Sequence, residues 1–324
     1  MSKMPRLMGT ACFIIVTLAW PAAHAQQPPP ERPLTIYPPA GLPIIPVMEG
    51  WYDNEDGSVT ISFGYHNRNE EGVVIVPFGD NNFIEPAEFD GVQPTFFDRG
   101  RHTGVFTITL PEERRRDSVW WNIKTGANPL YRVPGRSASE AYQLDRNPRP
   151  LGSVSPIVWF EEDGVRSSGP DGVETAFGEP VQAGSPVTLT VHATDPSERD
   201  PNDPRFQEPV PLNVVWEVHQ GPAAVEFSRH ESTQIAPPEE PSDPDADADA
   251  DADSDADAEE AADEPAGNIV PLAEGAGTAQ VIANFTEPGE YLLRIQVDNW
   301  AGPDSSEADQ CCWTNVYQRV TVVR

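Results

Sequence analysis

Two adjacent cysteines, Cys311 and Cys312, are the side chains best suited to redox chemistry. In an oxidising compartment two thiols normally pair. Neighbouring Cα atoms lie about 3.8 Å apart across a trans peptide, whereas ordinary disulfides span about 4.4–6.8 Å, so a bridge between neighbours is strained and readily reduced. We expect this vicinal bridge to stiffen the loop over residues 300–310.

Two other states of the cysteine pair remain open. The thiols can stay unpaired on opposite faces of a strand, with one buried and one exposed. They can also pair between molecules or on a metal, although adjacent cysteines lack the two-residue spacing of zinc sites and no histidine lies nearby in the sequence. A redox-sensing module that uses this pair is therefore one alternative function.

Two turns rich in Asp and Asn offer the oxygen ligands that Ca²⁺ prefers. They cover residues 53–57 (DNEDG) and 80–82 (DNN). The first turn is not an EF-hand, because its glycine stands fifth rather than sixth and no Glu occupies the twelfth position. Tight turns need the same residue types for backbone reasons alone. We expect no cofactor, with one candidate exception, a Ca²⁺ ion held among Asp53, Glu55, Asp56, Asp80 and Asn81.

The histidines form no recognisable catalytic motif. The sequence contains no HExxH, GxSxG, P-loop or GxGxxG pattern. His192 and His219 fall on the outward faces of predicted strands. A site around His66, Asp80 and His102 would make the protein a hydrolase or metal-dependent enzyme, and this is the rival to a non-enzymatic function.

Aromatic residues suggest a binding surface. In a strand over residues 119–123, Trp120 and Trp121 must point to opposite faces, and Trp121 shares its face with apolar neighbours. Trp120 is then exposed, alone or beside Trp51 and Tyr52, or it packs against the second domain or the linker. An exposed platform of this kind stacks on sugar rings or on another protein.

The first 25 residues have the composition of a signal peptide. Lys3 and Arg6 supply a positive start, residues 7–22 are nearly all apolar, and small residues precede a cleavage site after Ala25. No later segment is apolar for long enough to cross a membrane. We therefore expect a secreted or periplasmic protein with no transmembrane segment in the mature chain.

The charge of the chain is strongly acidic but uneven. The sequence has 52 Asp and Glu against 21 Lys and Arg, for a net charge of −31, which excludes a nucleic-acid partner bound through its phosphates. Residues 239–264 contain 14 acids and no base, so we expect residues 237–267 to be a disordered insert. The Pro-rich residues 26–46 predict a semi-rigid linker.

Alternation of apolar and polar residues predicts an all-β chain. In the first half it predicts strands over residues 59–65, 106–110 and 119–123, with residues 73–76 as the hairpin partner of the first. These suggest an antiparallel sandwich whose topology is not readable. In the second half, the predicted strands fit an immunoglobulin-like sandwich with a Trp in mid-chain and a Tyr that opens a late strand; they cover residues 187–192, 212–219, 278–285, 291–298 and the C-terminus.

Three segments of the second half resemble polycystic-kidney-disease-type (PKD-like) immunoglobulin domains. Residues 184–191 (GSPVTLTV) are similar to their second strand, and Trp216 is similar to their core tryptophan. The late hairpin matches at Gly289, Tyr291, Leu293 and Val297. The resemblance covers about residues 153–324 and implies a fold rather than a function. The whole chain also resembles secreted bacterial proteins that end in a CCWTN segment, which implies no activity.

The sequence therefore predicts two antiparallel β-sandwich domains, over residues 47–150 and 151–324. The second is immunoglobulin-like (PKD-like) and carries the acidic insert. The predicted function is an exported, non-enzymatic binding or scaffold protein of the cell envelope or extracellular space. Its predicted partner is a protein or a glycan that contacts the sandwich surfaces.

Overall fold

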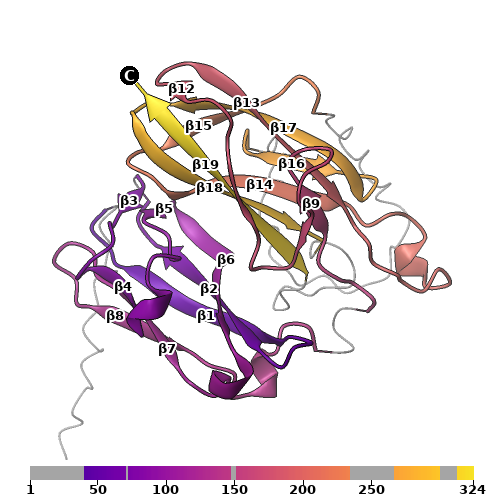
Figure 1. Ribbon diagram of the computed structural model, residues 1–324, viewed down its shortest axis with the longest axis horizontal. Coiled ribbons are helices and arrows are strands. Elements are labelled where there is room, and N and C mark those ends of the chain that lie inside the picture. The colour runs from indigo at the N-terminus through magenta and orange to yellow at the C-terminus, as the bar shows by residue number, and fades with distance from the viewer. Residues whose placement is uncertain (1–39, 71, 147–150, 234–265, 300–311) are drawn as a thin grey trace, which may run out of the picture. The chain divides into compact units, whose positions relative to one another are not determined.

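The computed structural model describes residues 40–324 except residue 71 and residues 147–150, 234–265 and 300–311. The predicted signal peptide, most of the predicted linker, nearly all of the predicted acidic insert and Cys311 lie outside the described residues. The chain is all-β, as predicted, and its sheets are largely antiparallel (Figure 1). Among the described residues the helical elements are four short 3-10 turns, namely η1 (Ala87–Phe89), η2 (Glu112–Arg114), η3 (Glu140–Tyr142) and η4 (Pro204–Phe206). Within this part of the chain no helix is long and apolar enough to cross a membrane.

The first sandwich packs two three-stranded sheets around one core. One sheet has the order β1 (Ile44–Asp53), β2 (Val59–Asn67) and β6 (Gly100–Leu110), and the other has the order β4 (Asn82–Glu85), β7 (Val119–Ile123) and β8 (Tyr131–Gly135). Alternate residues of these strands meet between the sheets because successive side chains point to opposite faces. Trp121 is fully buried there, with its ring 5.0 Å from that of Phe106 and at right angles to it.

The pairing of β2 differs from the sequence prediction. Both edges of β2 are occupied, by β1 on one side and β6 on the other. The predicted hairpin between residues 73–76 and β2 is therefore wrong; β3 (Val74–Ile75) pairs instead with β5 (Phe96–Phe97). The physical reason is length, because β1 and β6 form long ladders with β2 whereas β3 has only two residues to pair. Strand β1 also begins inside the predicted linker, so residues 44–46 belong to the sheet.

The second sandwich packs a five-stranded and a larger sheet face to face. The first has the order β10 (Ser167–Ser168), β9 (Ile157–Trp159), β13 (Pro186–Thr194), β17 (Ala276–Phe285) and β15 (Val225–Arg229). The second has the order β11 (Glu174–Ala176), β19 (Trp313–Val323), β18 (Gly289–Asp298), β14 (Leu212–Gln220) and β16 (Ile269–Leu272), and β12 (Val181–Gln182) also pairs with β19. Both β11 and β12 run parallel to β19, whereas the other pairs are antiparallel. This is the strand arrangement of an immunoglobulin-like sandwich.

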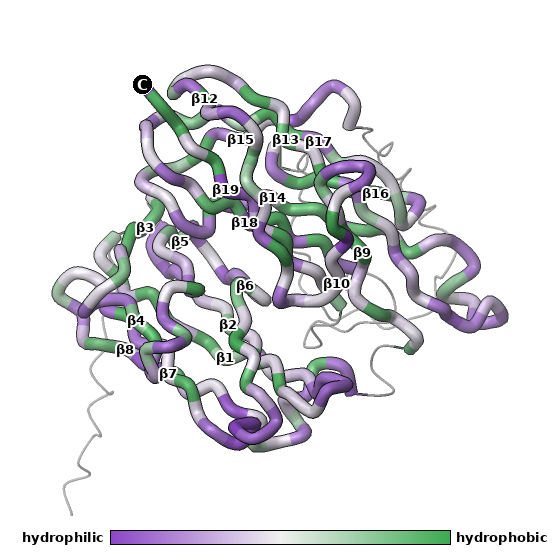
Figure 2. Tube along the Cα trace, in the orientation of Figure 1, coloured by the Kyte–Doolittle hydropathy of each residue, from purple (hydrophilic) through white to green (hydrophobic). Residues whose placement is uncertain are grey.

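The apolar faces of these strands form the second core, and Figure 2 shows hydrophobic segments along β14, β17 and β18. Trp216 is 1% exposed, as its predicted place in the core requires. Tyr291 is buried, and its hydroxyl donates a 2.9 Å hydrogen bond to the carbonyl of Glu287, four residues upstream. A tyrosine at this corner is typical of immunoglobulin-like sandwiches, where it holds the turn before a core strand.

Candidate functional site

A buried ion cluster joins the two sandwiches within the compact unit formed by residues 38–324. Glu217 of β14 accepts a 2.7 Å hydrogen bond from Nδ1 of His102, on β6 of the first sandwich, and it also pairs with Arg294 of β18. The other ring nitrogen of His102 donates to the carbonyl of Arg99 at 2.9 Å. Both nitrogens of His102 face groups that can only accept, so the ring is held as an imidazolium.

The charges in this cluster shift one another's pKa values. Burial favours the neutral form of Glu217, but the charge of Arg294 and the hydrogen bond from His102 outweigh burial and hold the pKa of that carboxyl well below its usual range. Burial also opposes the charge on His102, yet the hydrogen bond and charge of Glu217 raise the pKa of His102 above 6.5. The ring of Tyr65 stacks on His102 at 4.7 Å and covers the imidazolium.

One backbone carbonyl of the first sandwich accepts hydrogen bonds from several side chains of the second sandwich. The carbonyl of Gly104 accepts 2.9 Å hydrogen bonds from Arg294 and from the side chain of Asn315. Gly104 has a φ of +58°, and a Cβ at this position would lie 2.7 Å from the ring of Trp313. Only glycine provides both the left-handed backbone and the close approach that these hydrogen bonds need.

His219 is buried beside the cluster, although the sequence placed it on an outward, solvent-facing side of its strand. It is 2% exposed because the first sandwich covers that face of β14. Its Nε2 donates to the carbonyl of Val92 at 2.8 Å, which leaves Nδ1 as an acceptor with no hydrogen-bond partner among the described residues. Burial lowers the pKa of His219 to about 4, so the ring is neutral near pH 7. His219 lines a cavity of about 190 Å³ together with Asp171 and Tyr317.

The structure does not bring the residues of the predicted enzyme site together. His102 pairs with Tyr65 and His66 pairs with Arg101, so the two histidines point to opposite faces of the sheet. Asp80 lines a hollow with Asn81 and Lys124 that contains neither histidine.

Two carboxylates of the first predicted calcium loop have protein partners. Asp53 pairs with Arg115, and the carboxylate of Asp56 accepts hydrogen bonds from the backbone and hydroxyl of Ser58 at 3.0 and 2.6 Å. The bonds from Ser58 lower the pKa of Asp56, and Glu55 is exposed in the same turn. Among the described residues no group of three or more His, Cys, Asp or Glu is placed to hold a metal. Calcium binding at Asp53, Glu55, Asp56, Asp80 and Asn81 stays a prediction.

Trp51 and Tyr52, named as candidate neighbours of an exposed Trp120, are 6% and 9% exposed, so they form no open platform. The segment after β8 folds back over them: the indole of Trp51 donates to the carbonyl of Ser139 at 2.9 Å. Tyr52 packs 5.7 Å from the ring of Trp313. Trp120 is half-buried, and the guanidinium of Arg132 covers its ring at 4.0 Å. These aromatic rings are therefore occupied by contacts within the chain.

Cys312 directly precedes β19 and is 4% exposed. Its amide donates to the side chain of Asn299 at 3.0 Å. Cys311 lies outside the described residues, so the vicinal bridge stays a prediction.

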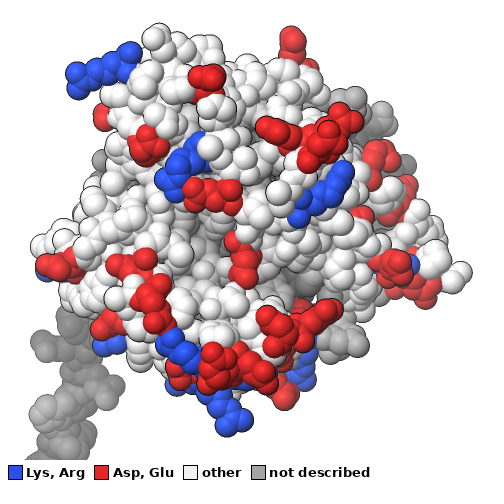
Figure 3. Space-filling view, in the orientation of Figure 1, with Lys and Arg blue, Asp and Glu red and all other residues white. Residues whose placement is uncertain are grey.

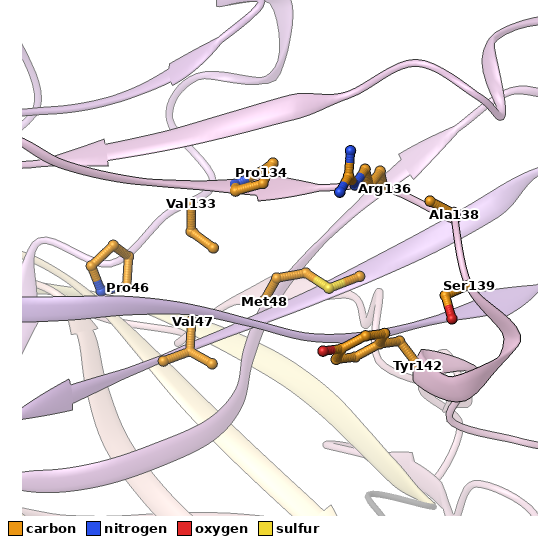
Figure 4. Close-up of a pocket in the computed structure, with 9 residues that line it drawn as sticks. All are labelled: Pro46, Val47, Met48, Val133, Pro134, Arg136, Ala138, Ser139 and Tyr142. Carbon is orange, nitrogen blue, oxygen red and sulfur yellow. The ribbon is translucent and has the colours of Figure 1, made fainter.

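A groove lies between two edge strands of the first sandwich. Strand β1 ends one sheet and β8 ends the other, and a cavity of about 370 Å³ lies between them. Figure 4 shows Met48 and Val133 extending into the space between the strands, with Tyr142 at one end. We call this the β1–β8 groove; its lining residues are Pro46, Val47, Met48, Val133, Pro134, Arg136, Ala138, Ser139 and Tyr142.

The groove has a fixed floor and an exposed rim. Met48 and Val133 are partly buried against the first core, whereas Tyr142 on η3 is 56% exposed. Gly50 allows η3 to approach, because a Cβ on Gly50 would lie 2.4 Å from the carbonyl of Tyr142. The amide of Leu144 then bonds to the carbonyl of Trp51 at 3.0 Å and closes that end of the groove.

Sequence reasoning missed the groove, although one signal could have indicated it. Pro46 lies within β1 and Pro134 within β8. Proline cannot donate to a β-ladder and is therefore confined to edge strands, strand starts or bulges. Two strands that each contain a proline are thus candidates for the open edges of their sheets.

Comparisons with known proteins add little to this geometry. No protein-family model and no curated protein matches the chain. Among solved structures, the chain is similar to a PapD-like domain of human CEP192, with 7% identity and a TM-score of 0.23, over 58% of this chain and 98% of that chain. It is similar to the D0-D1 domain of intimin, with 11% identity and a TM-score of 0.22, over 86% and 97%. It is similar to the adhesin InvE of Yersinia pseudotuberculosis, with 8% identity and a TM-score of 0.22, over 87% and 58%.

At these TM-scores the similarities carry no argument about this chain. The immunoglobulin-like assignment rests on the strand order of the second sandwich itself. The resemblance to PKD-like domains stays an expectation from the sequence.

Substitution of Glu217 tests the ion cluster. The Glu217→Gln variant leaves Arg294, whose side chain is 3% exposed, without its counter-charge. We expect the free energy of unfolding to fall by about 3–5 kcal/mol, because an unpaired buried charge is costly. In the control, Glu174→Gln removes the exposed partner of Arg319 and should cost at most about 1 kcal/mol. Urea unfolding followed by tryptophan fluorescence measures both, and equal losses would contradict a buried cluster.

The pH dependence of stability tests the burial of His219. Its pKa falls from 6.5 to about 4 on folding, so the unfolded chain binds more protons between these values and stability falls as the pH is lowered through that window. The stability that charged Glu217 contributes is lost only as the pH falls below the ordinary pKa of 4.5. The stability that charged His102 contributes is fully present below pH 6.5. Between pH 7 and pH 5 the wild type should lose about 2 kcal/mol more than His219→Gln. The same pH dependence in both proteins would show that His219 titrates normally.

Proposed function

We propose that the chain is an exported, non-enzymatic binding protein that receives an extended polypeptide segment of a protein partner in the β1–β8 groove. The single observation that carries the proposal is the groove itself, an apolar channel between two strand edges. The sequence supports export through its N-terminal signal, and the arrangement of side chains supports binding rather than chemistry.

An extended segment suits this groove on physical grounds. Edge strands present unpaired backbone groups, which an extended chain can reach. Pro46 and Pro134 each remove one amide donor, and this limits open-ended pairing of strands between copies. Recognition then depends mainly on side chains that enter the channel beside Met48, Val133 and Tyr142. A cavity of about 370 Å³ lies within the usual size of ligand pockets and accommodates a few such side chains.

Filling the groove tests the proposal. Ala138 is exposed and lines the groove, so Ala138→Trp should block it without disturbing the core. Ala141 is exposed on η3 but does not line the groove, so Ala141→Trp is the matched control. Binding is measured on an array of random short peptides and, in parallel, on an array of oligosaccharides.

We expect the wild type and Ala141→Trp to bind a shared set of peptides that Ala138→Trp binds about tenfold or more weakly. Peptide binding that Ala138→Trp leaves unchanged would contradict the proposal, as would binding to oligosaccharides alone or to neither array.

A further inference from the structure

A second hollow adjoins the β1–β8 groove and is lined by different chemistry. It has a volume of about 370 Å³ and is lined by Arg116, Ser118, Arg136, Ser137 and Ala138. Arg136 and Ala138 line both cavities, so the hollow and the groove meet at these two residues. We call this second cavity the arginine hollow.

The two arginines of this hollow are free of ion pairs within the described chain. Their neighbours are engaged: Arg114 pairs with Glu88 and Asp117, and Arg115 pairs with Asp53. Asp117, which directly follows Arg116, is thereby already bound by Arg114 at 2.8 Å. Arg116 and Arg136 make no ion pair with any described residue.

Unpaired cations that share one hollow are unexpected in this protein. The chain has 52 acidic residues for 21 basic ones, and acidic side chains are spread over the face seen in Figure 3. Yet no Asp or Glu is among the described residues that line either the groove or the arginine hollow. Among the described residues, the lining where the groove meets the arginine hollow therefore contains two guanidinium groups and no carboxylate.

The hollow offers the donors that a carboxylate needs. Each guanidinium carries five N–H donors in a planar fork that matches the two oxygens of a carboxylate. The hydroxyl of Ser118 is exposed beside them, whereas that of Ser137 donates to the carbonyl of Arg115 at 2.7 Å and so fixes the wall. A charge-assisted hydrogen bond of this kind is roughly twice as strong as a neutral one.

We propose that the arginine hollow binds the carboxylate of an acidic residue in the partner segment, while apolar side chains of the same segment lie in the β1–β8 groove. This inference rests on the proposed function and specifies the partner as an acidic, extended polypeptide. The positive hollow at one end of an apolar channel would also set the direction in which the segment binds.

Charge-neutral variants test this inference. The probes are array peptides that bind the wild type and contain Asp or Glu, together with the same peptides carrying Asn or Gln instead. We expect Arg116→Gln and Arg136→Gln each to weaken binding of the acidic peptides about three- to tenfold, and the double variant to weaken it further. The amide-bearing peptides should bind the wild type more weakly and respond little to either variant. Binding of the acidic peptides should also weaken as salt is added.

The control matches the change in net charge of the single variants. Arg324 is exposed at the end of β19 and makes no ion pair in the described chain, so Arg324→Gln removes the same charge far from the hollow in sequence. It should bind all peptides as the wild type does. A loss as large as that of Arg116→Gln would show a general charge effect and overturn the inference. Acidic and amide peptides that bind equally well, and remain sensitive to Ala138→Trp, would overturn it while the proposed function stands.

Acetate, a small carboxylate, tests the arginine hollow independently of peptide binding in the β1–β8 groove. Titration with acetate should shift the side-chain N–H signals of Arg116 and Arg136 in an NMR spectrum, and that of Arg324 should move less. This result would support the hollow as a carboxylate site even if no array peptide bound in the groove. Equal shifts at all three arginines would overturn it.

Discussion

The structure depends on the contact in which Glu217 lies between His102 and Arg294. Removing three charges from water is costly, and such a cluster persists only where each group finds a counter-charge and its hydrogen bonds. Here the imidazolium, the carboxylate and the guanidinium all do so, with the carbonyl of Gly104 as a further acceptor. The contact buries part of the polar face of β14 and β18 against the first sandwich, so the two sandwiches share a polar interface.

The ion cluster and the proposed binding groove lie on different strands. The ion cluster uses β6, β14 and β18, whereas the β1–β8 groove is lined only by residues from 46 to 48 and from 133 to 142. Substitutions at Glu217 therefore act on the joint between sandwiches, and substitutions such as Ala138→Trp act on the groove. The first sandwich holds the groove through its own core, because Met48 and Val133 pack against it.

The sequence predicted the fold wherever a strand faces one apolar core. Alternation located β2, β6, β7, β13, β14, β17 and β18, and Trp121 and Trp216 are buried as their patterns require. It failed for His219, because a polar face is typical of exposure and the residues that cover this side chain are far away in sequence: Val92, whose carbonyl it contacts, is 127 positions from His219. Alternation also did not indicate that Trp51 and Tyr52 are covered, because the segment after β8 that covers them has no strand period. The β1–β8 groove forms where the edge strands of two sheets lie side by side. The alternation of residues within one strand does not indicate which other strands lie beside it.

Hydrogen–deuterium exchange with a bound acidic peptide tests most directly whether recognition lies in the groove. If it does, the peptide should slow amide exchange in β1 around Met48, in β8 around Val133 and in residues 136–139. Exchange in β14 and β18 should not change, because their polar faces are already buried in the ion cluster. Slower exchange in β14 or β18 with none in β1 and β8 would contradict this assignment and move the binding surface to the second sandwich.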